Sequence, residues 1–142
     1  MSRRAMVKRT LEVSVVLVVE AVLYLDYRRG DGTFHYYTHL FAGATLALLL
    51  MTAAARHWGR PIRVPFLAVL GGHLLAMGPD LLYVRDIAHQ RWMDVFVAYN
   101  ISHFIPGRNL TWYLLFLAAM TLYLTAAPLG VAPRAAATTN SR

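Results

Sequence analysis

The sequence contains no cysteine among its 142 residues. This absence excludes disulfide bonds, iron–sulfur clusters, thiolate zinc sites and cysteine nucleophiles. Charged residues are also scarce, at 15% of the chain, and 7 acidic side chains stand against 14 basic ones. The sequence has no glycine-rich phosphate loop, no nucleophile elbow and no dinucleotide fingerprint. The usual motifs of soluble nucleotide-binding proteins and serine hydrolases are therefore missing.

Hydrophobic residues, by contrast, make up 58% of the chain. A single soluble domain of this length cannot bury that much apolar surface, so the composition predicts an integral membrane protein. The net charge of +7 raises the question of nucleic-acid binding. Its basic residues fall in short blocks beside apolar runs, a distribution typical of cytoplasmic membrane loops. We therefore expect a lipid bilayer as partner and no nucleic acid.

Four apolar runs, residues 7–25, 34–55, 64–84 and 110–127, approach the length of about 20 residues that a membrane span requires. The first run resembles a signal peptide, but two internal glutamates and the lack of a small-residue cleavage site favour an uncleaved helix. A fifth segment, residues 92–105, is too short for an upright span, so it is either tilted or re-entrant. The predicted fold is an all-α integral membrane protein, a compact bundle of four to five transmembrane helices. It forms a single domain over residues 1–130, followed by a disordered tail over residues 131–142.

The distribution of arginine predicts the orientation. The N-terminal segment and the loop 56–63 are purely basic, whereas the loops 26–33 and 85–91 mix basic with acidic residues. Because positively charged loops stay on the cytoplasmic side, the N-terminus and the loop 56–63 should be cytoplasmic and the mixed loops should face outward.

With this topology, five polar side chains from four separate segments reach a similar depth near the outer face: Glu20, His39, Asp80, His89 and Asp94. Carboxylates and imidazoles that project inward from facing helices are how helical bundles bind metal ions. A charge within a membrane segment is costly and therefore suggests a function. The simpler interpretations are that His39 is an interfacial residue and that Asp80, after a proline, caps a kink.

Two further histidines, His73 and His103, should lie close to mid-membrane. Their placement allows either an interhelical hydrogen bond or the axial ligation of a b-type haem. Gly71 and Gly72, beside His73, would let another helix or a flat cofactor approach closely.

The segment Thr38-His39-Leu40-Phe41-Ala42-Gly43 and the element Gly78-Pro79-Asp80 resemble motifs of the bacterial membrane-bound metal-dependent hydrolase family related to YdjM. In that family a later His-Arg-Gly-x-Thr-His motif follows. His89 matches its first histidine, Asp94 stands in place of its second, and Arg91 is displaced by one position from its arginine. Leu82 replaces the usual second aspartate. The resemblance implies a hydrolase in the bacterial inner (plasma) membrane and covers about residues 38–94.

Three functions compete on these grounds. The first is a metal-dependent hydrolase of a lipid or lipid-linked substrate, with zinc or another divalent metal on His39, Asp80, His89 and Asp94. In it, Glu20 acts as general base, and Arg91 or Arg85 holds an anionic headgroup. The second is a non-catalytic accessory subunit or assembly factor of a larger membrane complex, in which the acids pair with Arg91 or with a partner; a homo-oligomer also suits so small a chain. The third is a haem-binding electron carrier that uses His73 and His103.

Overall fold

The computed structural model describes residues 3–29, 33–83, 87–88, 90–95 and 104–126. All regular structure in these ranges is helical, and no strand occurs among them. The prediction of an all-α protein is therefore confirmed. The helices are α1 (Arg3–Arg29), α2 (Thr33–Trp58), α3 (Pro65–Ala76), α4 (Gly78–Tyr83), α5 (Arg91–Val95) and α7 (Arg108–Ala126). The expected tail over residues 131–142 lies outside the described residues.

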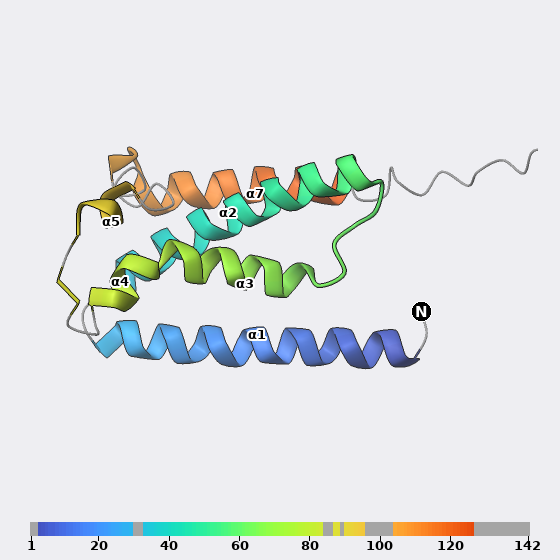
Figure 1. The fold of residues 1–142 in the computed structure, drawn as a ribbon, viewed down its shortest axis with the longest axis horizontal. Helices are drawn as coiled ribbons and strands as arrows, with labels where there is room; N and C mark the ends of the chain where they lie inside the picture. The colour runs from blue at the N-terminus through green and yellow to red at the C-terminus, as the bar shows by residue number, and fades with distance from the viewer. Residues whose placement is uncertain (1–2, 30–32, 84–86, 89, 96–103, 127–142) are drawn as a thin grey trace, which may run out of the picture.

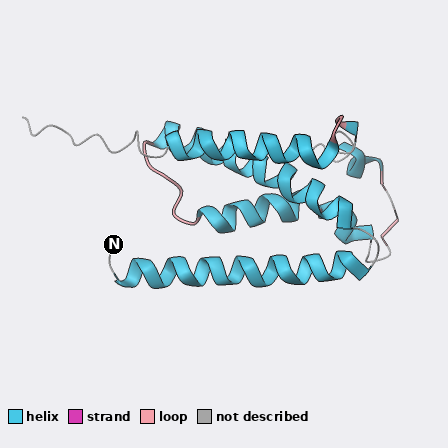
Figure 2. Cartoon of the chain, turned by 180° about the vertical axis from the view of Figure 1, so that it is seen from behind, coloured by secondary structure: helices cyan, strands magenta, loops and turns pink. Residues whose placement is uncertain are grey.

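The helices α1, α2, α3 and α7 run side by side, and the chain reverses direction from each to the next (Figure 1). The helix α2 packs mainly against α7 and α3, whereas α1 makes a smaller contact with α3 and α2. Seen from behind, α1 and α7 lie on opposite outer sides (Figure 2). The start of α1 and the loop 59–64 lie at one end of this arrangement, called here the N-terminal end. The end of α1, the start of α2 and α4 lie at the other, called the α4 end.

The helices α2 and α3 touch through a pair of glycines. A Cβ atom added to Gly43 of α2 would lie 2.3 Å from the carbonyl oxygen of Gly72, and one added to Gly72 would lie 2.4 Å from that of Gly43. Gly71, in contrast, faces open space among the described residues. The sequence left open whether a second helix or a cofactor approaches Gly71 and Gly72. The structure places a helix against Gly72. The contact brings the backbone of α2 directly against His73.

The third apolar run forms two helices rather than the single helix expected over residues 64–84. The helix α3 ends at Ala76 and α4 begins at Gly78. Pro79 causes this interruption, because it has no N–H to donate to the carbonyl one turn earlier. Hydrogen bonds from Met77 N–H to His73 O (2.9 Å) and from Leu81 N–H to Met77 O (3.0 Å) continue the helical path on either side. Asp80 consequently lies in the first turn of α4.

The start of α3 is capped by a side chain from α1. The residue before the helix, Val64, has no capping side chain. Oε1 of Glu12 instead accepts hydrogen bonds from the backbone N–H groups of Phe66 (2.9 Å) and Leu67 (3.2 Å). Glu12 is only 7% exposed, and its other oxygen lies 3.6 Å from Arg9. This acid therefore satisfies two N–H groups that α3 leaves without an internal partner.

We expect Glu12→Ala to lower the free energy of unfolding by about 2 kcal/mol, because two partly buried N–H groups lose their acceptor. Unfolding of the detergent-solubilised protein by a denaturing detergent, followed by circular dichroism, measures the loss. Glu12→Gln is the control, since its amide oxygen still accepts these bonds. This variant should lose less than half of the stability that Glu12→Ala loses. Equal losses for the two variants would contradict the capping role.

Large apolar side chains cover the outside of the molecule. On α1, Leu11 is 64% exposed and Val18 is 63% exposed, while Glu12 and Glu20 of the same helix face the other helices. Similar exposed side chains occur on the other three long helices, for example Leu50 of α2, Leu75 of α3 and Leu124 of α7. Among the described helices, His35–Trp58 and Arg108–Ala126 are long and apolar enough to cross a membrane by length and composition. The protein thus has apolar outer faces and polar groups between its helices.

Candidate functional site

Three helices contribute to a buried polar group, called here the inner cluster: Glu20 of α1, Tyr36 of α2 and His73 of α3. Nδ1 of His73 lies 2.9 Å from Oε1 and 2.8 Å from Oε2 of Glu20. The hydroxyl of Tyr36 donates to Oε2 of Glu20 at 2.8 Å. The His73 side chain is 0% exposed, and its ring meets that of Tyr36 edge to face at 5.1 Å. The carboxylate of Glu20 is therefore the shared acceptor of the cluster.

This arrangement determines which nitrogen of His73 is available. Because Nδ1 faces a carboxylate, the ring donates its Nδ1–H to Glu20, and Nε2 is left as the second functional atom. Nε2 is buried and has no hydrogen-bond partner among the described residues. A carboxylate that orients one ring nitrogen while the other can accept a proton or bind a metal is a recurrent arrangement in enzymes.

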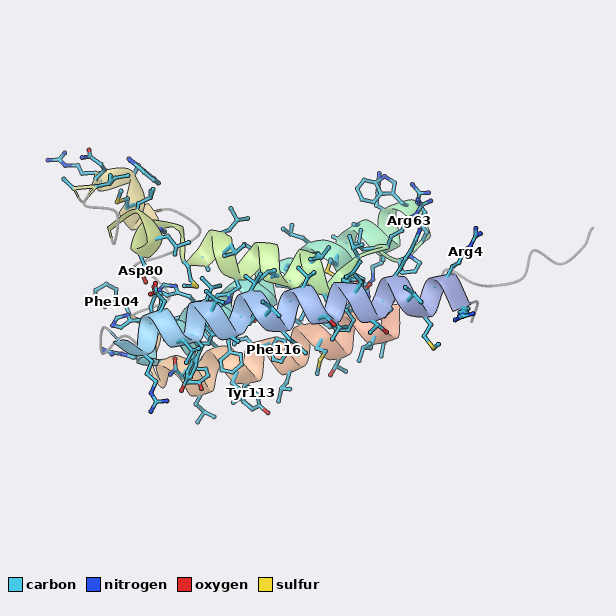
Figure 3. The ribbon with its side chains drawn as sticks, turned by 90° about the horizontal axis from the view of Figure 1, so that it is seen from below. Arg4, Arg63, Asp80, Phe104, Tyr113 and Phe116 are labelled. Carbon is cyan, nitrogen blue, oxygen red and sulfur yellow. The ribbon has the colours of Figure 1, made fainter. Side chains whose placement is uncertain are left out.

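A second group, the outer cluster, lies at the α4 end and consists of Tyr27, His39 and Asp80. Nε2 of His39, in α2, lies 3.1 Å from Oδ2 of Asp80 in α4. The hydroxyl of Tyr27, near the end of α1, donates to the same Oδ2. The His39 side chain is 1% exposed, whereas Asp80 is partly accessible. Figure 3 shows Asp80 at the α4 end of the bundle.

Aromatic contacts join the two clusters. The rings of Tyr27 and Tyr36 meet edge to face with centroids 6.2 Å apart. Tyr24, one turn before Tyr27, packs edge to face on Tyr36 at 5.3 Å. The titratable side chains between α1, α2 and the α3–α4 segment therefore form one continuous polar region that extends from His73 to Asp80.

No protein-family model, curated protein or solved structure matches this chain. The resemblance to hydrolase motifs is thus untested, and the function has to be argued from the residues themselves.

The structure brings together two of the four predicted metal ligands, His39 and Asp80. His89 and the side chain of Asp94 lie outside the described residues, although the backbone of Asp94 belongs to α5. Within the described part of the chain, no group of three or more potential metal-binding side chains is found.

The other predicted site residues lie elsewhere. Glu20, expected to act as general base, has His73 and Tyr36 as its partners. Arg91 is exposed on α5. Of the two histidines considered for haem, His73 is bound to Glu20 through Nδ1, and His103 lies outside the described residues, as do Arg85 and most of the segment 92–105.

Sequence reasoning did not identify the two tyrosines of the clusters. Helical spacing contained a signal for both. Tyr27 follows Glu20 by seven residues and therefore lies on the same face of α1, and Tyr36 precedes His39 by three residues on the same face of α2. Each tyrosine is thus a neighbour, on its own helix, of an acid or a histidine that the sequence analysis singled out.

Proposed function

We propose that this chain is an integral membrane protein that binds a divalent metal ion between α2 and α4. The ligand types, imidazole and carboxylate, favour zinc. We further propose that it acts there as a metal-dependent hydrolase of a lipid or lipid-linked substrate. The observation that carries the proposal is the buried imidazole of His39, whose Nε2 lies 3.1 Å from a carboxylate oxygen of Asp80.

The distribution of polar and apolar side chains supports insertion in a membrane. Leu11, Leu17, Val18 and Val22 on the outside of α1 are all more than 60% exposed. In water this apolar surface would be strongly unfavourable, whereas hydrocarbon solvates it. The carboxylates lie between the helices, which is where charged groups within a membrane find partners.

We expect the protein to stay in the membrane pellet after washing with alkaline carbonate.

The donor set fits part of a zinc site. Zinc binds imidazole nitrogen and carboxylate oxygen at about 2.0–2.1 Å in a tetrahedral arrangement, so two neighbouring ligand atoms lie about 3.3 Å apart. The separation of 3.1 Å between Nε2 of His39 and Oδ2 of Asp80 is close to this value. The hydroxyl of Tyr27 would hold the carboxylate in position from outside the metal. The predicted ligands His89 and Asp94 would complete the site.

A bound metal would supply an activated water and would polarise a carbonyl or phosphoryl oxygen. Of the chain's own groups, Glu20 would accept a proton, directly or through His73, whose Nε2 is the available base. Arg91 is exposed on α5 at the α4 end, where it would bind an anionic headgroup (Figure 1). A site at the end of the bundle, close to the predicted membrane surface, favours a bond near a lipid headgroup.

Elemental analysis of the protein purified in detergent tests the metal site. We expect a stoichiometric divalent metal in the wild type and a loss of at least tenfold in affinity for zinc in His39→Ala and Asp80→Ala. His57→Ala is the matched control, because His57 lies exposed on the same helix at the opposite end of the bundle. It should bind metal as the wild type does. Release of phosphate or of fatty acid from a panel of lipids, with and without a chelator, tests the hydrolysis.

The alternatives make different predictions for the same sample. Absence of stoichiometric metal, together with normal behaviour of both variants, would overturn the metal site. Co-purification of the metal-free chain with a defined larger assembly would favour an accessory subunit. A Soret band would instead identify a haem ligated through His73.

A further inference from the structure

A groove of about 530 Å³ opens between α1 and α3, away from both clusters. Its walls combine two kinds of side chain. Lys8, Arg9 and Arg63 provide three positive charges, and apolar residues provide most of the remaining surface, among them Leu11, Val15 and Leu67. Figure 3 shows Arg63 close to the start of α1, the end of the molecule at which Arg4 also lies.

The charges of the groove are not balanced within it. Its one acid, Glu12, is engaged by the backbone of α3 and by Arg9. Arg9 also places its guanidinium 5.7 Å from the centre of the Phe66 ring. Among the described residues, neither Lys8 nor Arg63 has an ion-pair partner. Two cations therefore stand over the groove with a net positive charge and no anion from the described chain.

The apolar part of the groove continues into the outer surface. Leu11 is 64% exposed, Val15 43% and Leu67 38%, and all three lie deeper along the helices than the cations. A ligand that places a phosphate between Lys8 and Arg63 would therefore lay an acyl chain along these side chains. The distribution of arginine predicts that this end of the bundle is cytoplasmic, and anionic lipids are concentrated in the cytoplasmic leaflet.

We infer that the groove binds an anionic phospholipid, with its phosphate between Lys8 and Arg63 and one acyl chain along α1 and α3. The inference rests on the membrane insertion proposed above but not on the metal or on hydrolysis.

Binding can be measured with the full chain in a neutral detergent. Phosphatidylglycerol should raise the thermal midpoint by several degrees and stay bound in native mass spectra, whereas phosphatidylcholine should do neither. Inorganic phosphate at the same concentration should have no effect. If phosphate alone reproduces the shift, the groove is a site for free anions and the lipid assignment is wrong.

The double variant Lys8→Gln/Arg63→Gln should weaken phosphatidylglycerol binding about tenfold or more. The matched control is Arg56→Gln/Arg60→Gln, which removes the same charge from exposed residues at the same end that do not line the groove. Equal weakening by both pairs would show that general surface charge binds the lipid and would overturn the inference. Unchanged binding in the Lys8→Gln/Arg63→Gln variant would also overturn the inference. The metal content should be unaltered in both double variants, so that failure here is distinguishable from failure of the metal site.

Discussion

Replacing Glu20 by leucine should destabilise the protein by about 3 kcal/mol, because it removes one partner from a buried polar group and leaves the others without compensation. His73 would lose its acceptor at Nδ1 while remaining fully buried, and the Tyr36 hydroxyl would lose its acceptor as well. The effect exceeds that expected for Glu12→Ala, since here a fully buried ring nitrogen and a tyrosine hydroxyl lose their acceptor, rather than two backbone groups at a helix end. Unfolding in mixed micelles, monitored by circular dichroism, provides the measurement.

A double-mutant cycle separates the pair from simple loss of packing. The variant Glu20→Leu/His73→Phe removes both polar partners and preserves an aromatic ring against Tyr36, so it should recover most of the lost stability. Glu20→Gln should cost only about 1 kcal/mol, because its amide oxygen still accepts a hydrogen bond. If the stability losses of the single variants Glu20→Leu and His73→Phe simply add in the double variant, Glu20 and His73 do not interact and the inner cluster is not a unit.

Substituting Gly43 by alanine should be at least as damaging. Its Cβ would lie 2.3 Å from the Gly72 carbonyl oxygen and 2.7 Å from the His73 Cα, and backbone atoms cannot move aside as a flexible side chain can. The helices α2 and α3 would have to separate, at a cost near the upper end of the 1–3 kcal/mol that is typical of overpacking. Separation would also lengthen the contacts from α2 to His73 and to Asp80. We therefore expect weaker binding at the proposed metal site together with the lower stability.

Gly71→Ala is the control for this experiment. Gly71 neighbours Gly72 in α3 but faces open space among the described residues, so an added methyl group has room. Alanine is also the better helix former, and the variant should be as stable as the wild type or up to about 1 kcal/mol more stable. A Gly43→Ala protein that unfolds at the wild-type denaturant concentration would show that the two helices do not meet at the glycines.

The sequence alone was sufficient to predict two of the long helices. The apolar runs of residues 34–55 and 110–127 correspond to α2 and α7, and their length depends only on local composition and on breakers such as Gly59, whose φ of 63° ends α2. The shared depth of His39 and Asp80 also followed from counting residues inward from the loops, since the rise per residue of a helix is fixed. Pro79 was visible in the sequence as a possible kink, but the separation of α4 from α3 was not predicted.

The partners of the polar side chains required the tertiary structure. Glu20 was expected beside His39 and Asp80 because of its depth, and the fold gives it His73 and Tyr36. Depth along the bundle axis is a one-dimensional coordinate, whereas contact also depends on how each helix is rotated. The polar and apolar residues of α1 form no marked stripe along the helix, so its surface does not specify that rotation. The close approach at Gly43 and Gly72 fixes α2 against α3, and the capping of α3 by Glu12 fixes α1 against α3. The sequence therefore indicated the acids and histidines of the two clusters but not Tyr27 and Tyr36, and the packing of the helices decided which of these residues meet.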